Sequence, residues 1–265
     1  MSDSPTTHHP LGIDIGGSGV KGAPVDLARG EFAAKRLRFD TPSPSTPKAV
    51  AKVVAEIAEH FRAQSGDSPI GITVPAIVTN GTVRSAANID DAWIDTDADA
   101  LFSDAIGRPV HVVNDADAAG LAEVKYGAAK DRDGLVIVTT LGTGIGSALI
   151  YDGVLVPNSE LGHLEIDGHD AESRAAARVK EDTDISWSHW GKRLTRYYEV
   201  LEFLFSPDLF VVGGGISKKA DKFLPHVKID TPIVPAELLN TAGIVGAAWL
   251  ASHPRGRAAG HAADS

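Results

Sequence analysis

The segment LGIDIGGSGVKGAPV, residues 11–25, consists of an apolar run, a glycine-rich turn and a second extended run. This pattern predicts two strands joined by a glycine turn. The segment LVIVTTLGTGIGSALIY, residues 135–151, repeats the pattern, with Gly142 in the place of Gly16. One unit lies near the start of each half of the chain. We therefore expect a duplicated α/β fold of two lobes, with mixed sheets flanked by helices.

The rest of the sequence indicates how the two lobes are filled. Apolar side chains recur at helical spacing between Val50 and Phe61, which predicts an amphipathic helix. Residues 171–205 also look helical. Largely apolar runs predict strands covered on both faces; they are residues 70–74, 110–113 and 209–212. The expected division of the chain is an N-terminal lobe, 11–115, completed by a closing helix, 243–251, then a C-terminal lobe, 116–242, and a disordered tail, 252–265.

Composition narrows the class of protein. Apolar residues make up 43% of the 265 residues and charged residues 23%, as in ordinary globular proteins. The net charge of −10 gives no general attraction for nucleic acid. The absence of cysteine excludes disulfides and thiolate metal sites and fits a reducing compartment. With no secretory leader and no long apolar run, we expect a cytoplasmic protein that binds neither nucleic acid nor membrane.

Three apolar strands each enter a glycine turn, DIGGSG, TLGTGIG and VVGGG. Glycine allows positive φ and lets backbone N–H groups approach a ligand closely, and converging N–H groups suit phosphate oxygens. A single glycine turn is weak evidence, but three at strand ends favour a phosphate donor. The candidate donor-binding residues are Asp14, Gly16, Gly17, Ser18, Gly19, Lys21, Thr140, Gly142, Thr143, Gly144, Gly213, Gly214 and Gly215.

Two other phosphate motifs fit the first turn poorly. Gly17, Gly19 and Gly22 have the spacing of the dinucleotide-binding fingerprint, which requires a helix to begin there. Pro24 would break that helix. Gly17 and Gly22 also have the spacing of the lysine-containing phosphate loop, but Ala23 stands where the lysine is required.

Polar residues that could serve a phosphoryl transfer lie near these turns. Asp14 precedes the first turn and could hold Mg²⁺ indirectly, through water, or simply cap the turn. Asn114 and Asp115 follow a buried strand, where ligands of parallel sheets gather. A carboxylate there can accept the proton of an attacking hydroxyl, although an Asn-Asp turn is by itself unremarkable. Glu160 and His163 offer groups for a polyhydroxylated ligand, or less readily for a metal together with His169.

At these residues the chain resembles the ROK family of sugar kinases, in the actin-like ATPase superfamily with its ribonuclease H-like fold. The similarity spans residues 11–251 and includes LGIDIGGSGVKGA, VNDADAAGLAEVKYGAA, TTLGTGIGSALIYDG, NSELGHLEID and FSPDLFVVGGGISKK. The resemblance implies that Asp115 is the catalytic base and that the three glycine turns bind the phosphate donor. It also implies sugar contacts by Asn88, Asn114, Asp115, Glu160 and His163, with Mg²⁺ as the metal cofactor and a homodimer as the assembly.

The chain departs from the general family pattern after Glu165. A cysteine-rich, zinc-binding stretch is replaced by IDGHDAESRAAARVKEDTDISWSHW, so we expect no zinc site. Glu172 is the best match to the last sugar-contacting glutamate of the family. The same replacement resembles the members that use inorganic polyphosphate, which implies glucose, or also mannose, as acceptor and polyphosphate together with ATP as donors. An ATP-only sugar kinase is the alternative, and a sugar-sensing regulator is disfavoured because only about ten residues precede the first strand, too few for a DNA-binding module.

A polyphosphate chain would need cations beyond the glycine turns. The candidates are Lys21, Lys218, Lys219 and Lys222, followed by Lys180, Lys192 and Arg193.

Overall fold

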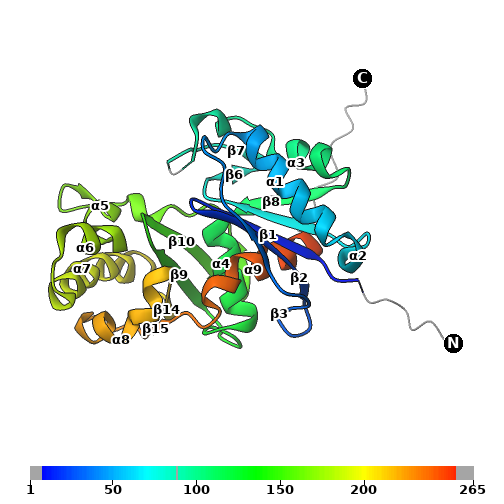
Figure 1. The fold of residues 1–265 in the computed structure, drawn as a ribbon. Coiled ribbons are helices and arrows are strands. Elements are labelled where there is room, and N and C mark those ends of the chain that lie inside the picture. The colour runs from blue at the N-terminus through cyan, green and yellow to red at the C-terminus, as the bar shows by residue number, and fades with distance from the viewer. Residues whose placement is uncertain (1–7, 88, 255–265) are drawn as a thin grey trace, which may run out of the picture.

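The computed structural model describes residues 8–87 and 89–254 and has two α/β lobes, each built on one mixed sheet (Figure 1). It confirms the expected duplicated fold. Asn88 and residues 255–265 of the expected tail lie outside the described residues. Ser252, placed in that tail by the sequence, is instead the last residue of the closing helix, α9 (Ala242–Ser252).

The first sheet has the order β3-β2-β1-β5-β8, and β4 also pairs with β2. β1 is antiparallel to β2 and parallel to β5, which is parallel to β8. Its strands are β1 (Leu11–Gly16), β2 (Gly19–Asp26), β3 (Glu31–Phe32), β4 (Leu37–Phe39), β5 (Ile70–Val74) and β8 (Val110–Asn114).

The second sheet, of order β11-β10-β9-β14-β15, repeats this topology. β9 is antiparallel to β10 and parallel to β14, just as β1 is to β2 and β5. Its strands are β9 (Leu135–Leu141), β10 (Ile145–Tyr151), β11 (Val154–Val156), β14 (Leu209–Gly213) and β15 (Ile233–Pro235). The glycine turns after β1 and β9 therefore occupy equivalent places in the two lobes.

Helices cover both faces of the first sheet. α1 (Pro47–His60), α2 (Arg62–Ser65) and α3 (Ala98–Ile106) lie on one side, and α9 packs on β1 and β5 from the other (Figure 1). Gly12 and Gly71 leave no room for a Cβ because backbone carbonyls of α9 lie against them. α9 also packs on α4 (Asp115–Tyr126), which in turn covers β9 and β10. These two helices lie between the sheets, and the exact lobe boundaries at residues 115 and 242 stay a prediction.

The helical region expected at residues 171–205 is divided into three pieces. They are α5 (Glu172–Ala175), α6 (Ala177–Thr183) and α7 (Trp187–Phe205). Ala176 adopts an extended conformation between the first two, and Asp184 is left-handed after α6. α7 buries Trp190, Leu194, Tyr198 and Leu201 in the core beneath β9 and β14.

Short elements complete the lobes. They are β6 (Val78–Thr79), β7 (Thr82–Val83), β12 (Glu165–Ile166), β13 (His169–Asp170), α8 (Ala220–Phe223) and the 3₁₀ turns η1 (Asp91–Trp93), η2 (Leu161–His163), η3 (Gly215–Lys219), η4 (Leu224–His226) and η5 (Leu239–Thr241). Within the described ranges, none of the helices combines the length and apolar character needed to cross a bilayer.

Candidate active site

Asp14 lies near the end of β1, flanked by partners on both neighbouring strands. It pairs with Lys21 of β2 and with Thr73 of β5 in the sheet register. Thr73 donates its hydroxyl hydrogen to Oδ1 of Asp14 at 2.9 Å, and Nζ of Lys21 lies 3.6 Å from Oδ2. Gly243, near the start of α9, lies against the same carboxylate. The sheet thus orients this acid beside the first glycine turn.

Asp115 is the first residue of α4, directly after β8. Its carboxylate accepts a hydrogen bond from the backbone N–H of Ala116 at 2.9 Å. Burial raises the pKa of the Asp115 carboxyl to about 7, assisted by the nearby negative charges of Asp14 and Glu160. The residue nevertheless keeps some solvent exposure, so a substrate can reach it. A carboxylate with a pKa near 7 is matched to the work of a general base.

Asn114 is buried, and its side chain makes two hydrogen bonds within the protein. Its side-chain oxygen accepts from the N–H of Asp117 at 3.0 Å, which caps α4, and its amide nitrogen donates to the carbonyl of Ala76 at 3.0 Å. One amide hydrogen remains beyond these two contacts. The predicted sugar contact of Asn114 would therefore be made by a side chain that is already held in place.

Glu160 is carried by a segment that contacts both lobes. Asn158 binds β6 through two hydrogen bonds of 2.9 Å with the backbone of Val78, and its own N–H donates to Asp117 on α4. Ser147 of β10 accepts from the N–H of Leu161 at 2.9 Å. These contacts hold Glu160 close enough to Asp115 to affect its pKa. Burial and the nearby Glu172 in turn raise the pKa of Glu160, against the lowering effect of His163.

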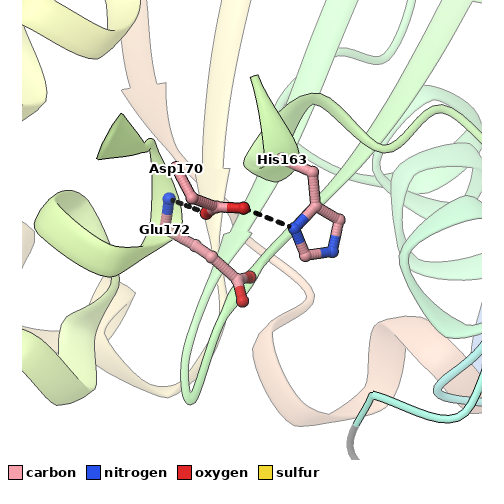
Figure 2. Close-up of side chains that lie close together, drawn as sticks. All are labelled: His163, Asp170 and Glu172. Carbon is pink, nitrogen blue, oxygen red and sulfur yellow. Dashed lines mark hydrogen bonds and ion pairs between the residues drawn. The ribbon is translucent and has the colours of Figure 1, made fainter. Parts of the chain in front are cut away.

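His163 forms a cluster with Asp170 and Glu172 (Figure 2). Nδ1 of His163 lies 2.9 Å from Oδ2 of Asp170. Since an ionised carboxylate can only accept, Nδ1 is the donor and Nε2 is left for a ligand. This hydrogen bond raises the pKa of the imidazole. Asp170 also accepts from the N–H of Glu172, which links all three residues.

Glu172 connects that cluster to the second glycine turn. Its Oε2 accepts a hydrogen bond from the N–H of Ile145 at 3.0 Å. A Cβ at Gly144 would collide with the same carboxylate. Glu172, matched to the last sugar-contacting glutamate of the family, therefore lies beside both His163 and the turn that follows β9.

The glycine turns are held by contacts to their carbonyl groups. Arg38 donates to the carbonyl of Ser18 at 2.7 Å and Thr41 to that of Gly16 at 2.5 Å. The N–H of Arg178 donates to the carbonyl of Gly142 at 3.0 Å. Gly214, whose φ is +83°, packs against Leu141 at the end of β9, so the second and third turns are neighbours.

Of the two roles expected for glycine in these turns, positive φ applies to one residue only. Positive φ occurs only at Gly214 among the predicted turn glycines. Gly17, Gly142 and Gly215, one from each turn, have no atom within 4 Å of a would-be Cβ and no left-handed backbone. They are the only described glycines with both properties. Neither a left-handed conformation nor packing requires glycine there, and glycine leaves room for a ligand to approach the backbone.

The donor atoms near Asp14 fit Mg²⁺ better than a softer metal. Asp14 and Asp115 present carboxylate oxygens, the ligands that Mg²⁺ prefers, and the neighbouring Lys21 favours indirect binding through water. The group formed by His163, Asp170 and Glu172 has ligand atoms within 4.8 Å of one another. Its hydrogen bonds already orient the three side chains without a metal, and the expectation of no zinc site stays a prediction.

Some residues that position the candidate site were not predicted from the sequence. Thr73 could have been noticed as a hydroxyl within an apolar strand, and Asp117 as a second acid two positions after Asp115. No local signal indicated that Asp170 would orient His163 or that Asn158 would position Glu160. Ser18, Thr140 and Thr143 lie in or beside the turns as expected, whereas Asn88 lies outside the described residues.

Comparison with known proteins shows the family of the chain. The ROK family model matches residues 10–178. Polyphosphate glucokinase of Mycobacterium tuberculosis is 52% identical over 244 residues, which are 92% of this chain and 91% of that protein. The inorganic polyphosphate/ATP-glucomannokinase of Arthrobacter sp. strain KM is 54% identical, with a TM-score of 0.89 over 94% of this chain and all of that one.

A more distant structure shares the fold at lower identity. The ROK family glucokinase of Streptomyces griseus, solved with glucose and AMPPNP, is 25% identical, with a TM-score of 0.77 over 92% of this chain and 99% of that one. A family model that matches most of the chain and a relative identical at half of its positions lead to one conclusion: the chain belongs to the ROK family.

Proposed function

We propose that the protein transfers a phosphoryl group from inorganic polyphosphate, or from ATP, to glucose, giving glucose 6-phosphate. The observation that carries the proposal is the set of ligand-accessible glycines in three turns, beside an acid whose pKa is about 7. Anion-binding turns and a general base are what phosphoryl transfer to an alcohol requires. The relatives named above support the choice of donors and of sugar.

The sugar would lie among the polar side chains around Asp115. Glu160, His163 and Glu172 would accept or donate hydrogen bonds to its hydroxyl groups, with Asp170 and Ile145 holding two of these side chains in place. Asn114 would add one amide hydrogen, and Asn88 is a further predicted contact. Asp115 would take the proton from the attacking 6-hydroxyl as the new P–O bond forms and the P–O bond to the rest of the donor breaks, which releases the shortened polyphosphate or ADP.

The donor would rest on the three turns. Backbone N–H groups within residues 16–19, 143–144 and 213–215 would surround the terminal phosphates, and Lys21 would add a positive charge. The N–H of Gly142 already donates to the carbonyl of Gly144 at 3.0 Å, so Gly142 would contribute space for the donor. A divalent cation is implied by the kinase relatives, and we propose Mg²⁺ held indirectly by Asp14. When bound, it would neutralise the charge of the transferring phosphate. Mannose as a second acceptor, a homodimeric assembly and a cytoplasmic location are further proposals that rest on the resemblance.

A coupled assay for glucose 6-phosphate tests the proposal directly. Purified protein, glucose and Mg²⁺ would be supplied with nucleotide-free polyphosphate or with ATP, and we expect product with polyphosphate. Turnover with ATP alone would favour an ATP-only kinase and contradict the choice of donor. Binding of glucose without product from either donor would instead indicate a sugar sensor.

A further inference from the structure

Three lysines converge on one tryptophan in the second lobe. Nζ lies 4.9 Å from the ring centroid of Trp187 for Lys180, 5.9 Å for Lys219 and 6.0 Å for Lys222. They come from three elements, α6, η3 and α8. Only one other lysine–aromatic contact, Lys125 with Trp249, occurs in the described ranges. Such contacts usually occur about once per 70–80 residues, so three at a single ring is a concentration that needs a reason.

The positive charges of this cluster are poorly neutralised by the protein. Asp184, whose side chain is fully exposed, lies 3.8 Å from Lys180. No other carboxylate among the described residues comes within 4.0 Å of the three ammonium groups. Lys219 and Lys222 are exposed. Like charges held together repel one another, and a polyanion would relieve that repulsion.

The cluster adjoins the two glycine turns of the second lobe. α6 is attached to the second turn by the bond from the N–H of Arg178 to the carbonyl of Gly142, and Lys180 follows two residues later. η3 begins at Gly215 of the third turn and ends at Lys219, and α8 carries Lys222 directly after it. α6, α7 and α8 gather at this end of the lobe in Figure 1. The three lysines are therefore connected to both turns through α6 and η3.

We propose that Lys180, Lys219 and Lys222, arranged around Trp187, form a subsite for the more distant phosphates of a polyphosphate donor. The proposal rests on the proposed function, because it assumes that the terminal phosphate is bound at the glycine turns. Each internal phosphate of such a chain carries a negative charge, which matches a row of cations. The subsite would act on donor affinity and chain-length preference, with no part in the chemical step.

The surroundings of Trp187 favour a phosphate chain over an adenine ring. Its ring contacts Phe223 and Trp190 with centroids 6.4 and 6.0 Å away, and the lysines lie over it. A stacked base would have to displace ammonium groups, whereas a polyanion would bind to them. The other basic surface, along α7, is less suited, because Arg196 makes two hydrogen bonds of 2.8 and 2.9 Å to Asp167.

The test compares a triple variant, Lys180→Gln with Lys219→Gln and Lys222→Gln, with the unaltered protein. KM would be measured for long-chain polyphosphate, tripolyphosphate and ATP. We expect KM for long-chain polyphosphate to rise at least about tenfold, since charged hydrogen bonds are lost. KM for tripolyphosphate and ATP should change less than about threefold. The control is Lys52→Gln, an exposed lysine on α1, which should leave all three values unchanged.

The outcomes separate this proposal from the proposed function. If the unaltered protein shows no turnover with polyphosphate, the donor assignment is wrong and the subsite that rests on it is overturned as well. If it uses polyphosphate and the triple variant has the same KM for every chain length, the subsite is wrong. An equal rise in KM for ATP and for polyphosphate would also overturn it, because the lysines would then serve the nucleotide. Retained turnover with ATP shows that the variant has folded.

A second measurement does not depend on turnover. Long-chain polyphosphate should alter the tryptophan fluorescence of the unaltered protein by drawing the ammonium groups away from the Trp187 ring. Trp187→Phe should abolish most of that change while leaving glucose phosphorylation by ATP in place. An undiminished change in Trp187→Phe would place the bound chain elsewhere.

Discussion

Thr73 donates a hydrogen bond to Oδ1 of Asp14 at 2.9 Å, and the two residues face each other in the parallel pairing of β1 with β5. Thr73 is wholly buried, so its hydroxyl cannot form a hydrogen bond with solvent. The contact fixes the direction of the carboxylate that we propose to act on Mg²⁺. The second oxygen is directed to Lys21 at 3.6 Å.

Thr73→Val is therefore expected to impair catalysis through Asp14. Valine keeps the shape of threonine but leaves Oδ1 without its donor, a loss of about 1–3 kcal/mol for a hydrogen bond to a charged group. We expect turnover to fall roughly tenfold and the Mg²⁺ concentration for half-maximal rate to rise. Steady-state kinetics over a range of Mg²⁺ would measure both. Thr73→Ser, which keeps the hydroxyl, should restore most of the activity; equal losses in the two variants would rule out the hydroxyl as the cause.

Alanine at each of three glycines should separate folding from donor binding. Gly17, Gly142 and Gly215 have space for a methyl group and no left-handed backbone, so the free energy of unfolding should change by less than about 1 kcal/mol. The methyl group would keep phosphate away from the turn, and we expect KM for the donor to rise about 10–100-fold. Glucose affinity, measured by calorimetry, should stay the same.

The matched control for this series is Gly120→Ala in α4. Its added Cβ would lie 2.5 Å from Cβ of Ala148, so this variant should lose about 1–3 kcal/mol of stability. Its donor KM should remain close to that of the unaltered protein if it folds. Unchanged donor KM in all three turn variants would contradict phosphate binding at the turns.

The sequence predicted the elements that depend on local pattern. Apolar runs and glycine positions predict both strand–turn–strand units, the buried strands and the closing helix. These elements could therefore be predicted without knowledge of tertiary contacts. Positive φ, one of the two roles expected of the turn glycines, is not found at Gly17 or Gly142, and both have open space beside them. Local sequence cannot report empty space, because that depends on what the rest of the chain leaves open.

The contacts that orient the site depend on residues far apart in the chain. Thr73 reaches Asp14 only because β5 pairs with β1, and Asn158 reaches Val78 across the two lobes. Asp170 follows His163 by seven positions, yet a hairpin of β12 and β13 brings them together. The pKa of Asp115 likewise results from burial and from Asp14. None of these relations has a periodic or compositional signal.

Asp115→Asn should abolish most turnover and leave glucose binding largely intact. Asparagine is similar in size but cannot take the proton, and loss of a general base costs about 10²–10⁴-fold. Turnover would be measured with both donors, and glucose binding by calorimetry. Nearly unchanged turnover would mean that another group, or solvent, accepts the proton.

The same variant should be more stable than the unaltered protein at alkaline pH. The folded state raises the pKa of Asp115 from 3.8 to about 7, so it binds more protons than the unfolded chain between these values. Stability therefore falls as pH rises from about 4 to 7 and is lowest above 7. Removing the charge should raise Tm at pH 8 by on the order of 5 °C, and the gain should shrink towards pH 4. A gain that does not depend on pH would contradict the raised pKa.

The rate should follow the ionisation of Asp115. Because the base must be charged, kcat/KM is expected to rise about tenfold per pH unit below 7 and to level off above it. Asp14 raises the pKa of Asp115 through its negative charge. In Asp14→Asn, whatever activity remains should show this inflection at lower pH. Glu160→Gln should shift it by less, since the effect of Glu160 is smaller.

Glu172 can be tested through its two contacts. Oε2 accepts from the N–H of Ile145 at 3.0 Å, and glutamine can accept the same bond without a charge. We expect Glu172→Gln to raise KM for glucose about tenfold, as a weakened sugar contact should, with little change in KM for the donor. Glu172→Ala should raise KM for glucose and KM for the donor, because the N–H of Ile145 beside the second turn loses its partner.

Steady-state KM values for glucose and for the donor in the two variants test this assignment. If Glu172→Ala leaves KM for glucose unchanged, Glu172 holds β10 in place and the sugar is bound without it.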